Sequence, residues 1–166
     1  ELATLNHGSL LRCEGVKLEA SRLATVALTR WTTGLNYLWA RMRLQREGDR
    51  LEYTTHRRWP GPRGASSRVV VRVGEEIDPS PLEQFLTARW GLFLPDRRGR
   101  TRYWPNEHAT WPLRAATLEH LDDQLVAVAG FPGLVEQPPI SVLHSSGVSV
   151  RFGPRRRAIH TDVTNW

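Results

Sequence analysis

The chain has 166 residues, of which 40% are hydrophobic and 24% are charged, a balance typical of a globular protein and unlike that of a disordered or fibrous chain. Its net charge is +6, and 22 of its 23 basic residues are Arg. No apolar run reaches the roughly 18 residues that a membrane-spanning helix needs, so we expect no membrane partner. Cys13 is the only cysteine, which excludes an internal disulfide and a cysteine-based zinc site and favours a cytoplasmic, reducing location.

The front of the chain predicts a weak strand followed by a helix. The chain begins without Met and without a signal-peptide pattern, and we expect this end to be truncated, with a strand over residues 5–16. The helix is predicted over 21–33, because Ser21 suits an N-cap and Gly34 suits a left-handed C-cap. Its buried stripe is expected to comprise Leu23, Val26, Ala27, Arg30 and Trp31.

Two stretches of alternating apolar and polar residues then predict a β-hairpin. They cover residues 38–46 and 51–58, and the link between them contains Gly48, which suits a tight turn. A Pro- and Gly-rich loop follows over 59–67, and the β-branched run 68–73 predicts another strand.

The second half opens on a helix start signal. Ser80, Pro81 and Glu83 have the spacing of a capping box with Pro at the first helical position. The buried stripe of this helix is expected to comprise Leu82, Phe85, Leu86 and either Arg89 or Trp90. A second hairpin, a strand, a short helix and a last strand are then predicted over 92–107, 111–121, 122–128 and 140–152.

The order of these elements predicts an α+β fold that is mainly β. Strands that come as hairpins favour antiparallel pairing. A closed or nearly closed antiparallel β-barrel, with two or three flanking helices, would leave few strand edges exposed. We expect a single domain over residues 1–153, followed by a basic, flexible tail over 154–166.

Four stretches of the chain together carry a family resemblance. LEASRLATVALTRWTTGLNYLWARM, over 18–42, is similar to "S-L-(D/E)-A-S-R … G-L-P-Y-x-W-A-R-M", with Asn36 where Pro is usual. LEQFLTARWGLFL, His108 with WPL over 111–113, and PISVLHSSGVSVRF over 139–152 follow in order. The chain resembles the YqjF-like family of uncharacterised bacterial proteins (domain of unknown function 2071). That resemblance implies the acetoacetate decarboxylase-like superfamily, whose fold is an antiparallel β-barrel with a buried cavity.

The same resemblance supplies a chemical test. It places residues 34–38 where the decarboxylases carry lysines, and this chain has Tyr37 and Leu38 there. Schiff-base decarboxylation needs a neutral amine, which Arg cannot provide. The only lysine, Lys17, lies before the predicted helix and is expected on the surface. We therefore expect no Schiff-base decarboxylase activity, and we expect no cofactor and no metal.

Candidate ligand-binding residues lie in two places. In the first hairpin, Tyr37 could donate a hydrogen bond, Trp39 lies beside it, and Arg41 could hold a carboxylate if it faces the barrel interior. The second group is a polar and aromatic cluster that could line an apolar pocket, made of Trp104, Glu107, His108 and Trp111. A regular strand would point Glu107 and His108 to opposite faces, which weakens a catalytic dyad.

The hypothesis these residues favour is a protein that binds a small, partly apolar and anionic molecule in a barrel cavity. The alternatives are an enzyme that uses Glu107 or His108 as general acid or base, and a structural or interaction module with a filled barrel. The arginines occupy scattered turn and tail positions, which argues against a nucleic-acid partner and for a solvated surface. The oligomeric state stays open.

Overall fold

A computed structural model describes residues 13–14, 17–33, 36–59, 64–88, 90–95 and 100–158 of the chain. The chain forms two compact units: unit 1 comprises Glu1–Asp78 and Pro112–Ser146, and unit 2 comprises Pro79–Trp111 and Gly147–Trp166. Strands with mostly antiparallel pairing dominate, which confirms the predicted α+β, mainly β class. Within the described ranges, no helix has both the length and the apolar character needed to cross a membrane.

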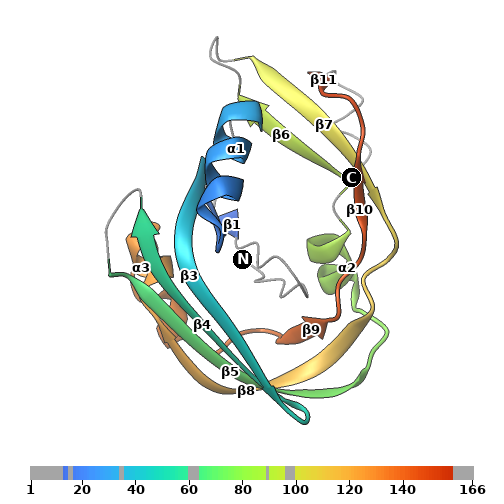
Figure 1. Cartoon of the computed structure of the whole chain (residues 1–166). Coiled ribbons are helices and arrows are strands. Elements are labelled where there is room, and N and C mark those ends of the chain that lie inside the picture. The colour runs from blue at the N-terminus through green and yellow to red at the C-terminus, as the bar shows by residue number, and fades with distance from the viewer. Residues whose placement is uncertain are drawn as a thin grey trace. The chain divides into compact units, whose positions relative to one another are not determined.

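Unit 1 is built on one seven-stranded sheet that curls as a half-barrel (Figure 1). Its strands lie side by side in the order β1 (Cys13–Glu14), β2 (Lys17–Ala20), β3 (Asn36–Glu47), β4 (Arg50–Trp59), β5 (Ser66–Glu76), β8 (Leu113–Asp123) and β9 (Leu143–Ser145). Each neighbouring pair is antiparallel except β2 and β3, which are parallel. Parallel strands need a crossover, and the helix α1 (Leu23–Thr33) provides it.

The helix α1 packs on the sheet through Val26, the one fully buried side chain among those of the helix that the structure describes. Val26 is 0% exposed and packs with Ala20, Tyr37 and the half-buried Trp39. The predicted buried stripe is wrong at its other apolar positions, since Leu23, Ala27 and Trp31 are exposed, Trp31 by 84%. A regular helical period predicts which residues share one face of the helix. In α1 the sheet covers only part of that face, so Val26 is buried and its neighbours on the face are not.

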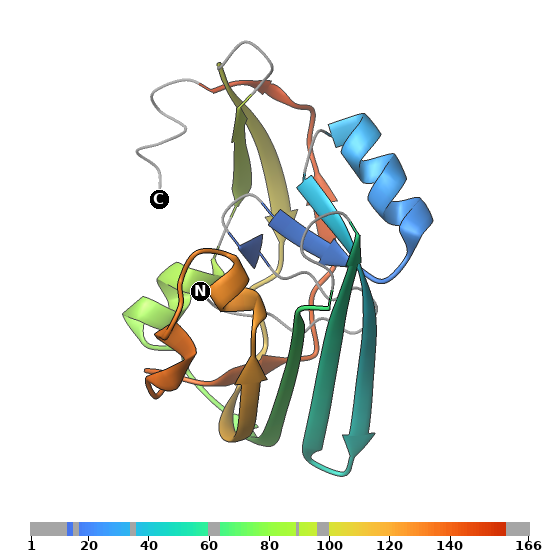
Figure 2. The same ribbon diagram turned by 90° about the vertical axis from the view of Figure 1, so that its left-hand side faces the viewer.

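The predicted first hairpin is confirmed as β3 and β4, which Figure 2 shows from the side. Glu47 pairs with Arg50, so the link is a two-residue turn of Gly48 and Asp49. Gly48 has a φ of 60°, which an L side chain rarely adopts and which two-residue hairpin turns require. A register shift between Trp39 and Ala40 interrupts the otherwise regular pairing.

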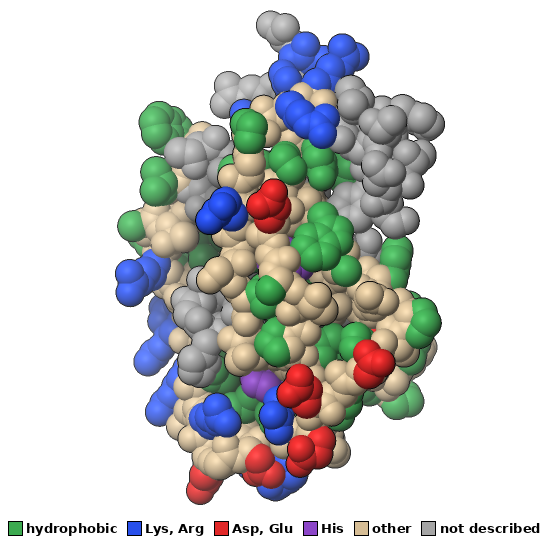
Figure 3. Space-filling model, turned by 90° about the vertical axis from the view of Figure 1, so that its right-hand side faces the viewer, with side chains coloured by type: hydrophobic (Ala, Val, Ile, Leu, Met, Phe, Trp, Pro, Cys, Tyr) green, Lys and Arg blue, Asp and Glu red, His purple; other side chains and the backbone are tan. Residues whose placement is uncertain are grey.

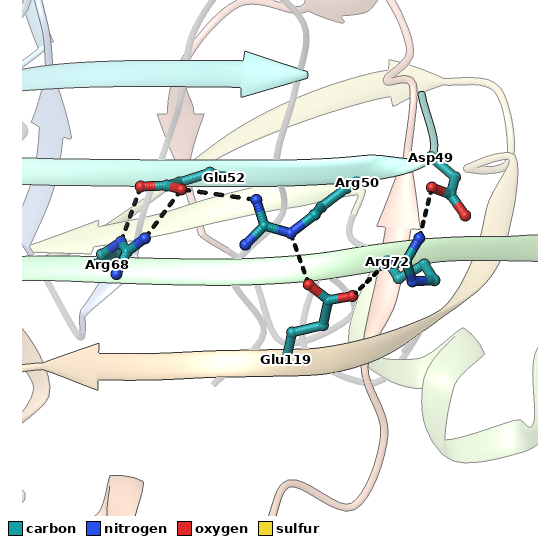
Figure 4. A network of polar contacts seen from close by, with 6 residues as sticks. All are labelled: Asp49, Arg50, Glu52, Arg68, Arg72 and Glu119. Carbon is teal, nitrogen blue, oxygen red and sulfur yellow. Dashed lines mark hydrogen bonds and ion pairs between the residues drawn. The ribbon is translucent and has the colours of Figure 1, made fainter. Parts of the chain in front are cut away.

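The strands of unit 1 separate a buried face from a charged face. On β4, the side chains of Leu51, Tyr53, Thr55 and Arg57 are buried, while the alternate residues share the other face with β5 and β8. That other face carries three acidic and three Arg side chains that form ion pairs, shown in Figure 4: Asp49, Arg50, Glu52, Arg68, Arg72 and Glu119.

A short helix ends the long strand β8. The helix α3 (Leu125–Val128) begins after Asp123, whose carboxylate Oδ1 accepts a hydrogen bond from the Val126 backbone N–H at 2.8 Å. Leu125 is 0% exposed and anchors the helix. Asp123 thus accepts a backbone hydrogen bond at the start of the helix, as predicted for a capping Asp, although the N-cap residue itself is Gln124. A 3₁₀ turn, η1 (Leu134–Glu136), follows.

Unit 2 contains a small sheet around one central strand. The strand β7 (Thr101–His108) has β6 (Gly91–Pro95) on one edge, and β10 (Val150–Phe152) and β11 (Arg156–Arg157) along the other. The predicted second hairpin is thus confirmed as β6 and β7. The first part of the predicted tail pairs with β7 as β11, and residues 159–166 lie outside the described residues.

Two other predictions in this part of the chain need correction. The helix α2 (Pro81–Thr87) has the predicted capping box between Ser80 and Glu83, but its apolar stripe is exposed rather than buried, as it is at Phe85 (54%). The predicted strand over 140–152 is two strands, β9 in unit 1 and β10 in unit 2. Gly147, with a φ of 98°, lies between them and breaks the extended chain.

Candidate functional site

The most unusual side chain in unit 1 is Arg57, which is 2% exposed. It lies on β4 two residues after Thr55, so the two side chains point to the same face of the sheet. Ala40 of β3 lies opposite Arg57 and is 0% exposed. A guanidinium group stays protonated in proteins, so this face buries a permanent positive charge. Charged groups are rarely buried unless they have a partner or a role.

Polar side chains form a row across three strands beside Arg57. Thr55 pairs with Ser67 of β5, and Ser67 pairs with Asp123 of β8, so all three share the face of Arg57. Thr55 and Ser67 are 3% and 4% exposed. The hydroxyl Oγ1 of Thr55 is buried, and within the described part of the chain it has no hydrogen-bond partner. A buried hydroxyl without a partner destabilises a fold, so this one needs an explanation.

These residues give one face of the sheet the chemistry of an anion site. A guanidinium binds a carboxylate or a phosphate through two parallel N–H donors, and a neighbouring hydroxyl can donate a further hydrogen bond. The buried side chains of Tyr53 and Leu51 lie on the same face of β4, further from Arg57 than Thr55 is. The arrangement therefore combines the positive charge of Arg57, the carboxylate of Asp123 two strands away, one unsatisfied hydroxyl and apolar surface.

The predicted residues of the first hairpin lie elsewhere. Tyr37 packs beneath α1, and its backbone oxygen accepts a hydrogen bond from Arg30 Nη1 at 3.0 Å. Trp39 Nε1 donates to the Ser21 backbone oxygen at 3.2 Å. Both residues thus attach α1 and its preceding turn to the sheet. Arg41 is exposed and pairs with the exposed His56, so it lies on the charged face and not beside Arg57.

The residues Arg57 and Thr55 were missed as site residues by the sequence reasoning, although the signal was present. The alternation over 51–58 predicts two faces, and Arg57 falls on the same face as Leu51 and Tyr53. An Arg at an apolar-face position of a strand is the sequence pattern that could have indicated this site.

The ion pairs of the charged face shift the pKa of two carboxyl groups. A bidentate hydrogen bond from Arg68, at 2.8 and 3.1 Å, lowers the pKa of Glu52. A hydrogen bond from Arg50 Nε at 2.8 Å lowers the pKa of Glu119, and Arg72 contributes in the same direction. Both carboxylates are partly exposed and paired, so their contacts stabilise the pairing of the strands and offer no catalytic group.

In unit 2, the His108 ring contacts two tryptophan rings. Its imidazole stacks on Trp90 at 4.3 Å between ring centroids, and Trp111 lies at 5.7 Å with a tilted ring. The distance from His108 Nδ1 to the Ala109 backbone oxygen is 2.7 Å, so Nδ1 carries the proton and donates it to that oxygen. The structure thus brings together two of the predicted residues, His108 and Trp111.

The other two predicted residues of unit 2 have different surroundings. Trp104 Nε1 donates to the Gly153 backbone oxygen at 2.7 Å, and its ring lies 5.1 Å from that of Phe152. Glu107 is exposed and alternates with His108 along β7, so the two side chains point to opposite faces, as the strand pattern predicts. An acid and base pair of Glu107 and His108 has no support in this geometry.

Comparison with known proteins gives a family and no function. The model of the family DUF2071, described as "Uncharacterized conserved protein", matches residues 15–149. No curated protein and no solved structure shows a significant match to the chain. Since the match covers most of the chain and agrees with the motifs described above, the chain belongs to the YqjF-like DUF2071 family.

Proposed function

We propose that the chain binds a small, partly apolar anion against the buried face of the unit 1 sheet, with Arg57 as the charge partner. The observation that carries the proposal is the burial of Arg57 and Thr55 on the same face of β4, where the Thr55 hydroxyl has no partner among the described residues. A ligand oxygen would accept a hydrogen bond from Thr55, and its negative charge would be attracted to the Arg57 guanidinium on the same face. The apolar neighbours on the face favour a ligand with a hydrocarbon part.

The proposal extends to the fold at a finer level. We propose that the curled antiparallel sheet is an acetoacetate decarboxylase-like barrel that has kept the binding site and lost the amine. The backbone of Lys17 pairs with Asn36, which lies within the stretch 34–38 that the resemblance aligns with the lysines of the decarboxylases. Positions 37 and 38 are Tyr and Leu, so the amine chemistry of those positions is gone. Binding or sensing, and not Schiff-base decarboxylation, is the proposed activity.

A thermal-shift experiment tests the anion site. Purified protein is screened against short-chain and aromatic carboxylates, keto acids, hydroxy acids and small phosphate esters, with native mass spectrometry for a co-purified molecule. A ligand at 100 times its Kd stabilises the folded state by about 2.7 kcal/mol, which raises the midpoint of a chain of this size by roughly 5–11 °C. We expect at least one small anion to produce such a shift.

Two Arg→Met variants locate the ligand. The shift should disappear in Arg57→Met and persist in Arg41→Met, which removes the same charge from the exposed face. If Arg57→Met does not fold, Thr55→Val takes its place, and its shift should fall. A shift of the same size in wild type and in both site variants would show that the ligand binds elsewhere. Borohydride treatment with a keto acid should leave the protein mass unchanged, and an adduct on Lys17 would revive the amine mechanism.

A further inference from the structure

One side-chain oxygen of unit 2 is buried without a partner. The carboxamide oxygen Oδ1 of Asn106 is buried, and within the described ranges it accepts no hydrogen bond. The backbone of the same residue is held in the sheet, because its N–H donates to the Trp90 backbone oxygen at 2.9 Å. Buried polar side-chain atoms of folded proteins are nearly always hydrogen-bonded, so this oxygen needs an explanation.

Strand pairing places aromatic rings on the same face as Asn106. Trp104 and His108 lie two residues before and two residues after Asn106 on β7, so the three side chains point to one face. Phe152 of β10 pairs with Asn106 and shares that face, and its ring lies 5.1 Å from that of Trp104. The Trp90 ring stacks on His108 at 4.3 Å between centroids. Asn106 thus lies between two pairs of packed rings, and we call these five residues the aromatic site.

The rings of the aromatic site reach the surface, although the oxygen between them does not. Phe152 is 47% exposed and Trp90 is 40% exposed. Figure 3 shows hydrophobic side chains at the surface over β7 and β10. The strand β10 has only three residues, and an exposed side chain such as Phe152 changes rotamer rapidly. Movement of this ring would open a path from the surface to the Asn106 oxygen.

The chemistry of the aromatic site favours an uncharged ligand that donates one hydrogen bond. A carboxamide oxygen is an acceptor, so the missing partner is an N–H or O–H group. Glu107, the one acidic residue of β7, points to the opposite face, and β10 has no acidic residue. An ammonium ligand would therefore be buried without a charge partner from these two strands. A sugar would bring several hydroxyls that need partners of their own, whereas a flat ring with one N–H needs only one.

We propose that the aromatic site binds an uncharged, flat heteroaromatic ring whose N–H donates to Asn106 Oδ1. The ligand ring packs against the neighbouring aromatic side chains, and its N–H supplies the partner that the oxygen lacks. All five residues of the site belong to unit 2. The site at Arg57 is proposed for an anion and uses residues of unit 1, so neither proposal depends on the other.

Pairs of ligands that differ by one methyl group test the proposal. Indole and benzimidazole are compared with their N-methyl derivatives by saturation-transfer NMR and calorimetry, at a pH where all four are uncharged. An N-methyl ring is equally flat but has no donor, so it would leave the Asn106 oxygen buried without a partner. We expect wild type to bind the N–H rings about 5- to 150-fold more tightly than the N-methyl rings.

Replacement of Asn106 separates the hydrogen bond from the bulk of the added methyl group. Asn106→Leu keeps the number and branching of the side-chain atoms but has no acceptor, so it should bind both members of each pair with similar affinity. The matched control is Thr101→Leu, because Thr101 is exposed and lies on the opposite face of β7. It should keep the wild-type preference, and so should Arg57→Met.

Two results would overturn the proposal. The first is an equal affinity of wild type for N–H and N-methyl rings, or a preference that survives in Asn106→Leu, because the oxygen would then take no part in recognition. The second is the absence of ring binding at millimolar concentration, including the case in which only sugars or ammonium compounds bind. The comparison of ligand pairs uses the wild-type chain, so it remains decisive if Asn106→Leu does not fold.

Discussion

Replacement of Thr55 by Val should make the ligand-free protein more stable. Val has nearly the shape of Thr but carries a methyl group in place of the hydroxyl. Thr55 is 3% exposed, and its Oγ1 has no hydrogen-bond partner within the part of the chain that the structure describes. The folded state therefore loses the hydration of this hydroxyl and receives no bond in return, and the variant avoids that loss.

The expected gain follows from the cost of a buried hydroxyl. Mutational data place the cost of burying such a group without a partner at about 1–3 kcal/mol. In a chain of this length, each kcal/mol changes the unfolding midpoint by about 2–4 °C. Thr55→Val should accordingly raise the midpoint by roughly 2–12 °C. The same variant should respond less than wild type to the anion that stabilises the protein, because the ligand loses one donor.

Calorimetry and urea unfolding of wild type, Thr55→Val and Thr54→Val check this reasoning. Thr54 is the matched control, since it is the neighbouring Thr on β4 but lies on the charged face, opposite Arg43 and Arg68. Its replacement should change the free energy of unfolding by no more than about 0.5 kcal/mol. A Thr55→Val variant that is less stable than wild type by 1 kcal/mol or more would show that the hydroxyl is hydrogen-bonded in the folded state, and the main argument for the anion site would be lost.

Two further predictions concern unit 1. Val26→Ala should lower the free energy of unfolding by about 1.5–2.5 kcal/mol, because it removes two buried methyl groups at the contact between α1 and the sheet. Trp31→Ala should lower it by less than about 0.5 kcal/mol, because that side chain is 84% exposed. Urea unfolding distinguishes these outcomes. Arg68 and Arg50 lower the pKa values of Glu52 and Glu119 in the folded state, so the stability that these carboxylates provide should be complete above their ordinary pKa of 4.5 and should disappear as the pH falls through the lowered values. The thermal unfolding midpoint of the double variant Glu52→Gln and Glu119→Gln should therefore vary less than that of wild type between pH 7 and pH 3. Identical pH profiles of the two proteins would contradict the assignment.

Local structure in this chain follows closely from local sequence. The spacing of Ser80 and Glu83 predicts a capping box, and both of its hydrogen bonds form. Gly48 predicts the turn between β3 and β4, and its φ is positive. Such features depend on a few adjacent residues, so the sequence contains everything that decides them. The motif resemblance likewise led to the family that the family model confirms.

The candidate site depended on contacts between distant segments. Alternation along 51–58 shows that β4 has two faces, but whether Arg57 or His56 is buried depends on which face other elements cover. The sequence reasoning therefore favoured Arg41, which the register places on the charged face. Burial is a property of the assembled sheet. An isolated strand has two faces, and only the packing of other elements decides which of them is buried.

The sequence by itself determined the class of the fold, the hairpins, the capping box of Ser80 and Glu83, the family and the absence of an amine at positions 37 and 38. Only the tertiary structure decided that Arg57 and Thr55 share a buried face, and that Asn106 lies between two pairs of aromatic rings. The physical reason is the separation along the chain of the residues that interact. Turns, caps and periodicity are set by neighbours along the chain, whereas desolvation and the gathering of aromatic rings are set by strands that meet from positions about 50 residues apart.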